Sequence, residues 1–195
     1  MHLFTKLSLL AALTTVAGDA LALDNSPTGR ALGLLRSHGA LASASAHDGF
    51  LARDVIVDAD GTEHVRFDRS YRGLPVIGGD VVVHSRQGRF RSMSVNQRQP
   101  LLLPVRPGRD AKSAIGAAAA AVGARTGDAP ESTLVVDARD IEPRLAWQVR
   151  LHNAQADMTY VVDAQDRRIL DRWSNLETAA VTGKARTLYS GEVAL

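Results

Sequence analysis

The chain has 195 residues, of which 45% are hydrophobic and 23% charged, a composition typical of an ordinary soluble protein. A formal net charge of +2 does not favour a nucleic-acid binder. The absence of cysteine excludes disulfides, thiolate nucleophiles and cysteine-based zinc sites.

The amino-terminal segment has the order of a secretory signal peptide. Lys6 precedes an apolar run at residues 7–17, and Ala20 and Ala22 form a small-x-small cleavage site. The run is shorter than the ~18 residues that span a bilayer. We therefore expect cleavage after Ala22, delivery to the periplasm or the medium, and no membrane contact afterwards. An uncleaved amphipathic helix is the alternative.

Residues 27–38 are predicted to form a helix that Ser26 caps and Pro27 begins. Its apolar stripe contains Leu32, Leu34 and Leu35. Residues 40–47 are expected to be a loop, residues 50–57 a strand, and residues 58–61 a turn.

Two strands with period-two alternation follow, at residues 64–68 and 81–84. In the first, Val65 and Phe67 share one face, and His64, Arg66 and Asp68 share the other. Residues 73–79 lie between the strands and contain Pro75 and three glycines. We expect them to form a tight reversal, since proline fixes φ and glycine tolerates a positive φ. The pattern predicts a hairpin.

This stretch closely resembles the core motif of the fungalysin/thermolysin propeptide (FTP) domain, which lies in the removable pro-region of secreted thermolysin-like zinc proteases. The motif residues are His64, Arg66, Phe67, Tyr71, Gly73, Pro75, Val76, Gly78 and Gly79. Many family members have glutamine where this chain has Arg69, so a role tied to that amide does not carry over.

His64 and His84 fall on neighbouring predicted strands, which raises the possibility of a metal site. Zinc needs three or four ligands, and the nearby acids Asp58, Asp60, Glu63 and Asp80 have no recognised spacing. The acidic turn at residues 58–61 also lacks the later bidentate glutamate of a calcium loop. We therefore expect hydrogen-bonded histidines and no metal or cofactor in this chain.

Pro100, Pro104 and Pro107 break both helix and sheet, which predicts a linker at residues 100–109. Asp110 can cap a helix that reaches about residue 125 and buries Ile115, Ala118 and Val122. Strands are expected at residues 134–136, 145–151, 158–163 and 169–170. One helix followed by an antiparallel meander is an α+β arrangement.

The strands at residues 145–149 and 160–164 resemble a PepSY module, which commonly follows the FTP domain in the same pro-regions. Arg167 replaces the usual glycine of its turn, and a left-handed residue other than glycine costs about 1 kcal/mol, so the turn type is expected to differ. Trp147 falls on the inward face with Leu145, Val149 and Leu151. We interpret it as a core residue, with a binding platform as the alternative.

The predicted architecture is two small helix-plus-antiparallel-sheet modules, FTP-like and then PepSY-like, with a cystatin-like α+β fold. The predicted divisions are a signal peptide at 1–22, the FTP domain at 23–99, a linker at 100–109, the PepSY-like module at 110–173, and a processing segment at 174–195.

No H-E-x-x-H occurs, and none of the histidines is followed by Glu: His2, His38, His47, His64, His84 and His152. G-x-S-x-G is also absent, and the glycine clusters do not precede a capped helix. This chain is therefore not expected to be an enzyme, with an unrecognised hydrolase as the remaining alternative.

Residues 182–191 resemble the segment with which the mature protease begins in this family. The resemblance implies the pro-region of a secreted zinc metalloendopeptidase precursor, a folding chaperone and inhibitor of its cognate protease domain. Zinc and calcium are expected only in the catalytic part, which this chain lacks. The alternative is a free-standing exported inhibitor or binding module. The expected inhibitory and processing residues are Arg172, Trp173, Asn175, Leu176, Thr178 and Ala180.

Overall fold

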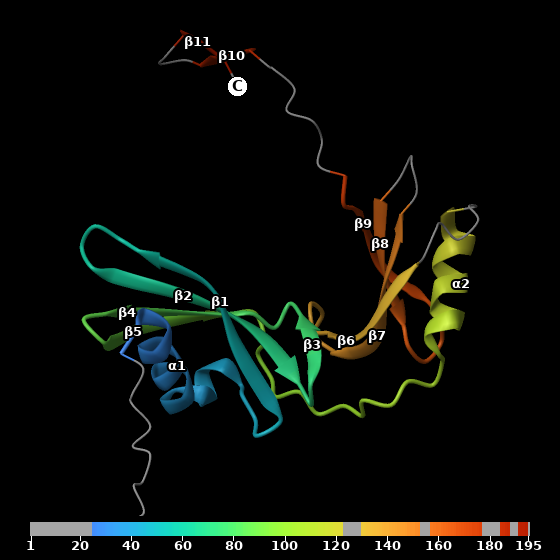
Figure 1. The fold of residues 1–195 in the computed structure, drawn as a ribbon, viewed down its shortest axis with the longest axis horizontal. Helices are drawn as coiled ribbons and strands as arrows, with labels where there is room; N and C mark the ends of the chain where they lie inside the picture. Colours follow the sequence, from blue (N-terminus) through green and yellow to red (C-terminus); the bar gives the residue numbers. More distant parts are fainter. Residues whose placement is uncertain (1–24, 123–129, 153–156, 177–183, 188–190, 195) are drawn as a thin grey trace, which may run out of the picture.

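A computed structural model describes residues 25–122, 130–152, 157–176, 184–187 and 191–194. The predicted cleavage residues Ala20 and Ala22 lie outside these ranges. The fold is α+β: two helices and a nine-stranded mixed sheet dominate the described part of the chain. Figure 1 shows two lobes side by side, each with one helix against its part of the sheet.

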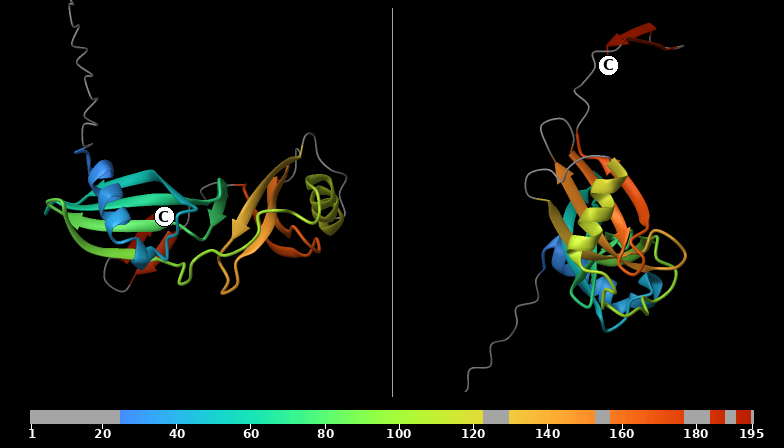
Figure 2. Two further views of the ribbon diagram at one scale, coloured as in Figure 1. Left: turned by 90° about the horizontal axis from the view of Figure 1, so that it is seen from below. Right: turned by 90° about the vertical axis from the view of Figure 1, so that its right-hand side faces the viewer.

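The first lobe is built on a central strand, β2 (Thr62–Tyr71). One edge of β2 pairs antiparallel with β1 (Asp48–Val57) and the other with β4 (Val81–Arg86), which also pairs with β5 (Arg89–Val95). Helix α1 (Pro27–Ser37) lies across one face of this sheet (Figure 2). The first-lobe core contains Ala31, Leu35, Ala42, Val65, Phe67, Val81 and Val83, all buried.

The first helix begins at the predicted residues. The Ser26 side chain accepts a hydrogen bond from Gly29 N at 3.1 Å, and Pro27 begins the helix. The predicted loop at residues 40–47 is only partly irregular, because Gly39–Ala42 form a 3-10 helix that buries Ala42. Ala42 belongs to the same buried cluster as Ala31 and Leu35 of α1.

The segment predicted as a tight reversal contains a strand. Leu74–Ile77 form β3, which pairs antiparallel with the end of β2 and parallel with β6 (Glu131–Asp137) of the second lobe. The reversal itself occupies only Arg72 and Gly73, both with positive φ. Two-residue hairpin loops of this kind match the twist of the strands they join.

The second lobe is an antiparallel meander of β6, β7 (Arg144–His152), β8 (Asp157–Asp163) and β9 (Ile169–Ser174). Helix α2 (Ala111–Val122) covers one face, and Asp110 caps it through a 2.9 Å bond from Ser113 N. Ala114, Ala118 and Ala119 of α2 are buried there together with Val149, Leu151, Tyr160 and Val162. The small alanines allow the helix to approach the sheet closely.

A separate pair of short strands, β10 (Lys184–Thr187) and β11 (Gly191–Ala194), lies apart from the nine-stranded sheet (Figure 1). Among the described residues, no helix is long and apolar enough to cross a membrane.

Candidate functional site

The predicted alternation of buried and exposed side chains is present in β2, and it continues beyond Val65 and Phe67. Val65 and Phe67 are fully buried, whereas Arg66 is exposed and pairs with Asp80 at 2.7 Å. The same inward face continues with Arg69 and Tyr71, which are 2% exposed each. The motif strand therefore buries a guanidinium in the first-lobe core.

Arg69 is held by the first residue of β1 and by two carbonyl groups from the segment before that strand. Its Nε donates to Asp48 Oδ1 at 2.7 Å, and its terminal nitrogens donate to the carbonyl oxygens of Ala42 and Ser43, each at 3.1 Å. Burial raises the pKa of Asp48, but hydrogen bonds from Arg69 and Ser45 outweigh burial and hold the pKa below its ordinary value. Sequence reasoning missed this pairing, although the alternation from Val65 placed Arg69 on the inward face.

Gly78 of the motif lies at the joint between the lobes. Gly78 has a φ of +79°, and a Cβ placed there would meet Arg139 Cγ at 2.7 Å and its backbone N at 3.2 Å. The adjacent contact is a backbone bond from Ala138 N to Ile77 O at 2.9 Å. Gly79 is equally close packed, since its Cβ would lie 2.6 Å from Val76 Cγ1. Gly78 therefore leaves room for Arg139 of the second lobe, and Gly79 leaves room for Val76 of β3.

A small apolar core lies at this joint. Its buried residues are Tyr71, Val76, Leu101, Val136 and Ala138. Tyr71 belongs to β2, Val76 to β3 and Val136 to β6, while Leu101 follows β5 and Ala138 follows β6. Leu101 is fully buried although it lies in the proline-rich segment. Pro75 is exposed on β3, and Gly73 has a φ of +82° in open space. The segment predicted as a linker therefore packs into the junction.

His64 and His84 meet on the face of the first-lobe sheet opposite α1. Their Nδ1 atoms are 2.5 Å apart, and His64 Nε2 lies 3.0 Å from Asp58 Oδ2. Within the described ranges, no group of three or more histidine and acidic side chains is placed to hold a metal ion.

A polar groove of about 400 Å³ opens on the face of the second lobe that α2 does not cover. Its walls come from β6, β7, β8 and the end of β9: Glu131, Thr133, Gln148, Arg150, Thr159, Trp173 and Asn175. Trp147 lies on the opposite face, packed against the α2 core, and its Nε1 donates to Arg109 O at 2.9 Å. The tryptophan at the groove is therefore Trp173, whereas the sequence pattern indicated only Trp147 as the alternative binding platform.

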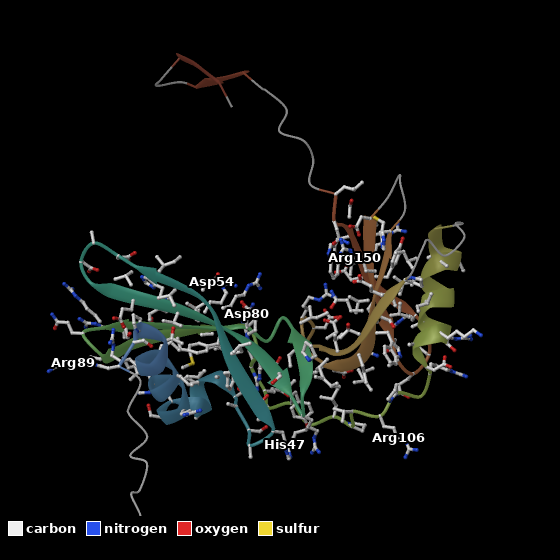
Figure 3. All side chains as sticks on the ribbon, viewed as in Figure 1. His47, Asp54, Asp80, Arg89, Arg106 and Arg150 are labelled. Carbon is white, nitrogen blue, oxygen red and sulfur yellow. The ribbon has the colours of Figure 1, made fainter. Side chains whose placement is uncertain are left out.

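A hydrogen-bonded cluster fixes the chain where it leaves β9. Asn175 Nδ2 donates to Asp157 Oδ1 at 2.8 Å and to Thr159 Oγ1 at 2.9 Å, and Asn175 N donates to Asp157 O at 2.7 Å. Arg150 donates to both oxygens of Asp157, at 2.9 and 2.5 Å. Figure 3 labels Arg150 at the end of the second lobe near which β9 leads out of the sheet.

The Asp157 carboxylate stays charged in this cluster. Hydrogen bonds from Arg150 and then from Asn175 hold the pKa of Asp157 far below its ordinary value. Because the carboxylate accepts from both partners at once, it joins β7, β8 and the end of β9. We call Arg150, Asp157, Thr159 and Asn175 the exit clamp.

Some of the predicted inhibitory residues lie before the end of the exit clamp and others after it. Arg172 and Trp173 lie within β9, paired with Tyr160 and Thr159 of β8. Leu176 follows the clamp and is 57% exposed. Thr178 and Ala180 lie outside the described residues. Among the described residues, the sheet therefore holds this segment as far as Asn175.

Comparison with known protein families gives a match within the first lobe. Residues 48–96 match the Fungalysin/Thermolysin Propeptide Motif. The propeptide motif thus covers β1 to β5 and the residue that follows, which contain the buried Arg69, the histidine pair and the junction glycines.

The chain is also similar to the transglutaminase-activating metalloprotease of Streptomyces mobaraensis, with 29% identity over 159 residues. The similarity covers 76% of this chain and 20% of that protein, so the chain spans about a fifth of the length of the relative. Among solved structures, the Bacillus megaterium YpeB C-terminal domain matches with a TM-score of 0.41 and 11% identity, over 77% of this chain and 64% of that one.

Proposed function

We propose that this chain is the pro-region of an exported thermolysin-like zinc metalloprotease, on which the protease domain folds and by which it is masked until processing. The observation that carries the proposal is the extent of the metalloprotease similarity. It covers 76% of the chain, whereas the propeptide motif occupies residues 48–96. The similarity to a protease therefore extends beyond the motif, into the second lobe or the segments that flank it.

The second lobe is proposed to be the PepSY-like module that faces the protease. Its uncovered face has a polar groove, and the chain leaves the sheet beside that groove at Asn175. A tethered protease domain would start within a few residues of this point. The segment from Leu176 onward would enter the catalytic cleft as an extended strand, with cleavage between Asn175 and Thr182. Zinc and calcium would belong to the protease domain.

A rigid two-lobed body suits a folding template. Folding of domains with many non-local contacts is slow, because loop closure must precede the contacts that reward it. A surface that is already folded lowers that barrier by ordering the partner early. The buried ion pair and the packed junction keep such a surface in one shape.

The proposal is tested by adding the purified chain to mature transglutaminase-activating metalloprotease from Streptomyces mobaraensis. We expect peptide hydrolysis to slow with increasing chain concentration, and recovery of activity from denatured protease to increase. An unchanged rate at saturating chain would contradict the inhibitory role. An in-frame H-E-x-x-H coding region downstream in the genome would support a precursor, whereas a genuine stop codon after Leu195 would favour a free-standing inhibitor module.

A further inference from the structure

The histidine pair of the first lobe has a partner at every ring nitrogen. His64 and His84 are directly opposite on β2 and β4, with their Nδ1 atoms 2.5 Å apart. On the outer sides, His64 Nε2 lies 3.0 Å from Asp58 Oδ2, and His84 Nε2 lies 3.0 Å from Ser94 Oγ. The protonation states of the two rings therefore decide whether the contact across the two strands is a hydrogen bond.

A hydrogen bond between the two Nδ1 atoms needs a hydrogen on one nitrogen and a lone pair on the other. A neutral imidazole has one N–H and one lone pair, whereas an imidazolium has two N–H groups. If His64 alone is charged, it donates to His84 Nδ1 and to Asp58, and every bond is kept. If both rings are charged, two N–H groups point at each other, with ring centroids only 4.8 Å apart. The doubly protonated pair must separate.

The neighbouring charges stabilise a first positive charge but not a second. Asp58 bonds to His64, and Asp60 lies in the same turn but pairs with Arg86 at 3.4 Å. Two residues along β2, Arg66 pairs with Asp80. From β1, Ile56 lies opposite His64, and Arg53 and Asp54 line the same hollow but pair with each other at 3.8 Å.

The side of His84 that faces β5 also lacks an acid. Ser92 lies opposite His84, Ser94 bonds to its ring, and Arg91 is the next residue along the strand. Burial, and then the nearby His64, lower the pKa of His84 from its ordinary value. A charge on His84 therefore meets hydroxyl groups and other cations.

We propose that the His64–His84 pair is an acid-sensitive latch that holds β2 against β4 at neutral pH and releases the two strands when both rings are protonated. The next cross-strand pair transmits the change inward. Glu63 lies opposite Ser85, accepts from its hydroxyl at 3.2 Å, and also pairs with Arg30 of α1. Opening of the latch therefore loosens the attachment of α1. This device does not depend on the proposed function.

The direction of the pH effect follows from the lowered pKa of His84. Below the ordinary histidine value of about 6.5, the unfolded chain binds a proton that the folded lobe resists. The contribution of neutral His84 to the stability of the first lobe is therefore complete above about pH 6.5. It is lost as the pH falls through the pKa of His84 in the folded lobe.

Hydrogen exchange of the full chain at pH 7.5 and 5.0 measures the latch, after correction for intrinsic exchange rates. Because the folded lobe resists protonation of His84, we expect amide protection in β2 and β4 to be lower at pH 5.0 than at pH 7.5. His84→Gln should flatten this change, and His47→Gln, at an exposed histidine before β1, should retain it. Both tryptophans, Trp147 and Trp173, lie in the second lobe, so their fluorescence serves as an internal reference.

Titration of the histidine rings by nuclear magnetic resonance gives a second readout on the unmodified chain. Because the charge of His64 lowers the pKa of His84, we expect His64→Gln to move the pKa of His84 upward. An unchanged pKa of His84 in His64→Gln would overturn the proposal. An equal loss of protection in wild type and His84→Gln would overturn it as well.

Discussion

Arg69 and Asp48 form a salt bridge of 2.7 Å in which both side chains are completely inaccessible to solvent. The pair joins β2 to the start of β1, and the remaining guanidinium donors bind carbonyl oxygens at the end of the 3-10 helix. Ser43, one of these acceptors, has a φ of 48°, so the loop adopts a left-handed residue where it wraps around the guanidinium. The first lobe is therefore organised around a buried ion as well as an apolar core.

Truncation of either partner should destabilise the first lobe strongly. Arg69→Ala leaves Asp48 buried and unpaired, and such breaks cost about 3–5 kcal/mol. Thermal unfolding followed by circular dichroism measures the loss. Arg66→Ala, which removes the exposed pair with Asp80, is the matched control and should cost less than about 1 kcal/mol. Removing both charges with Asp48→Asn and Arg69→Gln should cost less than Arg69→Ala, and a larger cost would contradict this account.

Gly78→Ala should loosen the junction between the lobes. The new Cβ would combine a left-handed backbone, which costs about 1–2 kcal/mol, with a 2.7 Å approach to Arg139 Cγ. Gly73→Asn is the control, because its Cβ meets open space and asparagine tolerates a positive φ. Exchange of the Ala138 amide, which donates to Ile77, reports on the junction.

The same contact can be isolated with a double-mutant cycle. Arg139→Ala removes the Cγ that collides with the new methyl group, so the cost of Gly78→Ala should be smaller in that background. Equal costs in both backgrounds would show that the Arg139 side chain is not the cause, and that the left-handed backbone and the backbone atoms of residue 139 make glycine necessary.

Asn175→Ala should release the end of β9. The substitution removes the side-chain bonds to Asp157 and Thr159 that fix the exit clamp. We expect limited proteolysis after Ser174 to become several-fold faster, while Arg172→Ala, at an exposed position on the same strand, should leave the rate unchanged. Because the pKa of Asp157 is lowered, the clamp should persist as the pH falls to the ordinary aspartate value of about 3.8 and fail only below it.

Arg167→Gly should stabilise the second lobe. Arg167 has a φ of 68°, so the turn keeps the left-handed conformation that glycine adopts without strain. Relief of that strain is worth about 1 kcal/mol, reduced by the greater flexibility of glycine in the unfolded chain. Urea unfolding followed by tryptophan fluorescence measures the gain. Arg168→Gly, next in the chain and without a positive φ, should not stabilise the lobe.

Local pattern was sufficient to predict most elements of the fold. The cap at Ser26, the alternation of Val65 and Phe67, and the inward face of Val149 and Leu151 are properties of neighbouring residues, and the structure confirms each of them. The prediction of a reversal at residues 73–79 was wrong in detail, because Leu74–Ile77 become a strand by pairing with β6, about 60 residues further along the chain.

What the amino-acid sequence determined alone is therefore most of the helices and strands, their buried faces, and the propeptide motif. Tertiary structure decided which residues those faces bring together: Arg69 with Asp48, Gly78 with Arg139, His64 with His84, and Asn175 with Asp157. The physical reason is that hydrophobic periodicity is local and non-directional. Ion pairs, ring contacts and close backbone approaches depend instead on the register between distant strands, which forms only when the sheet is complete.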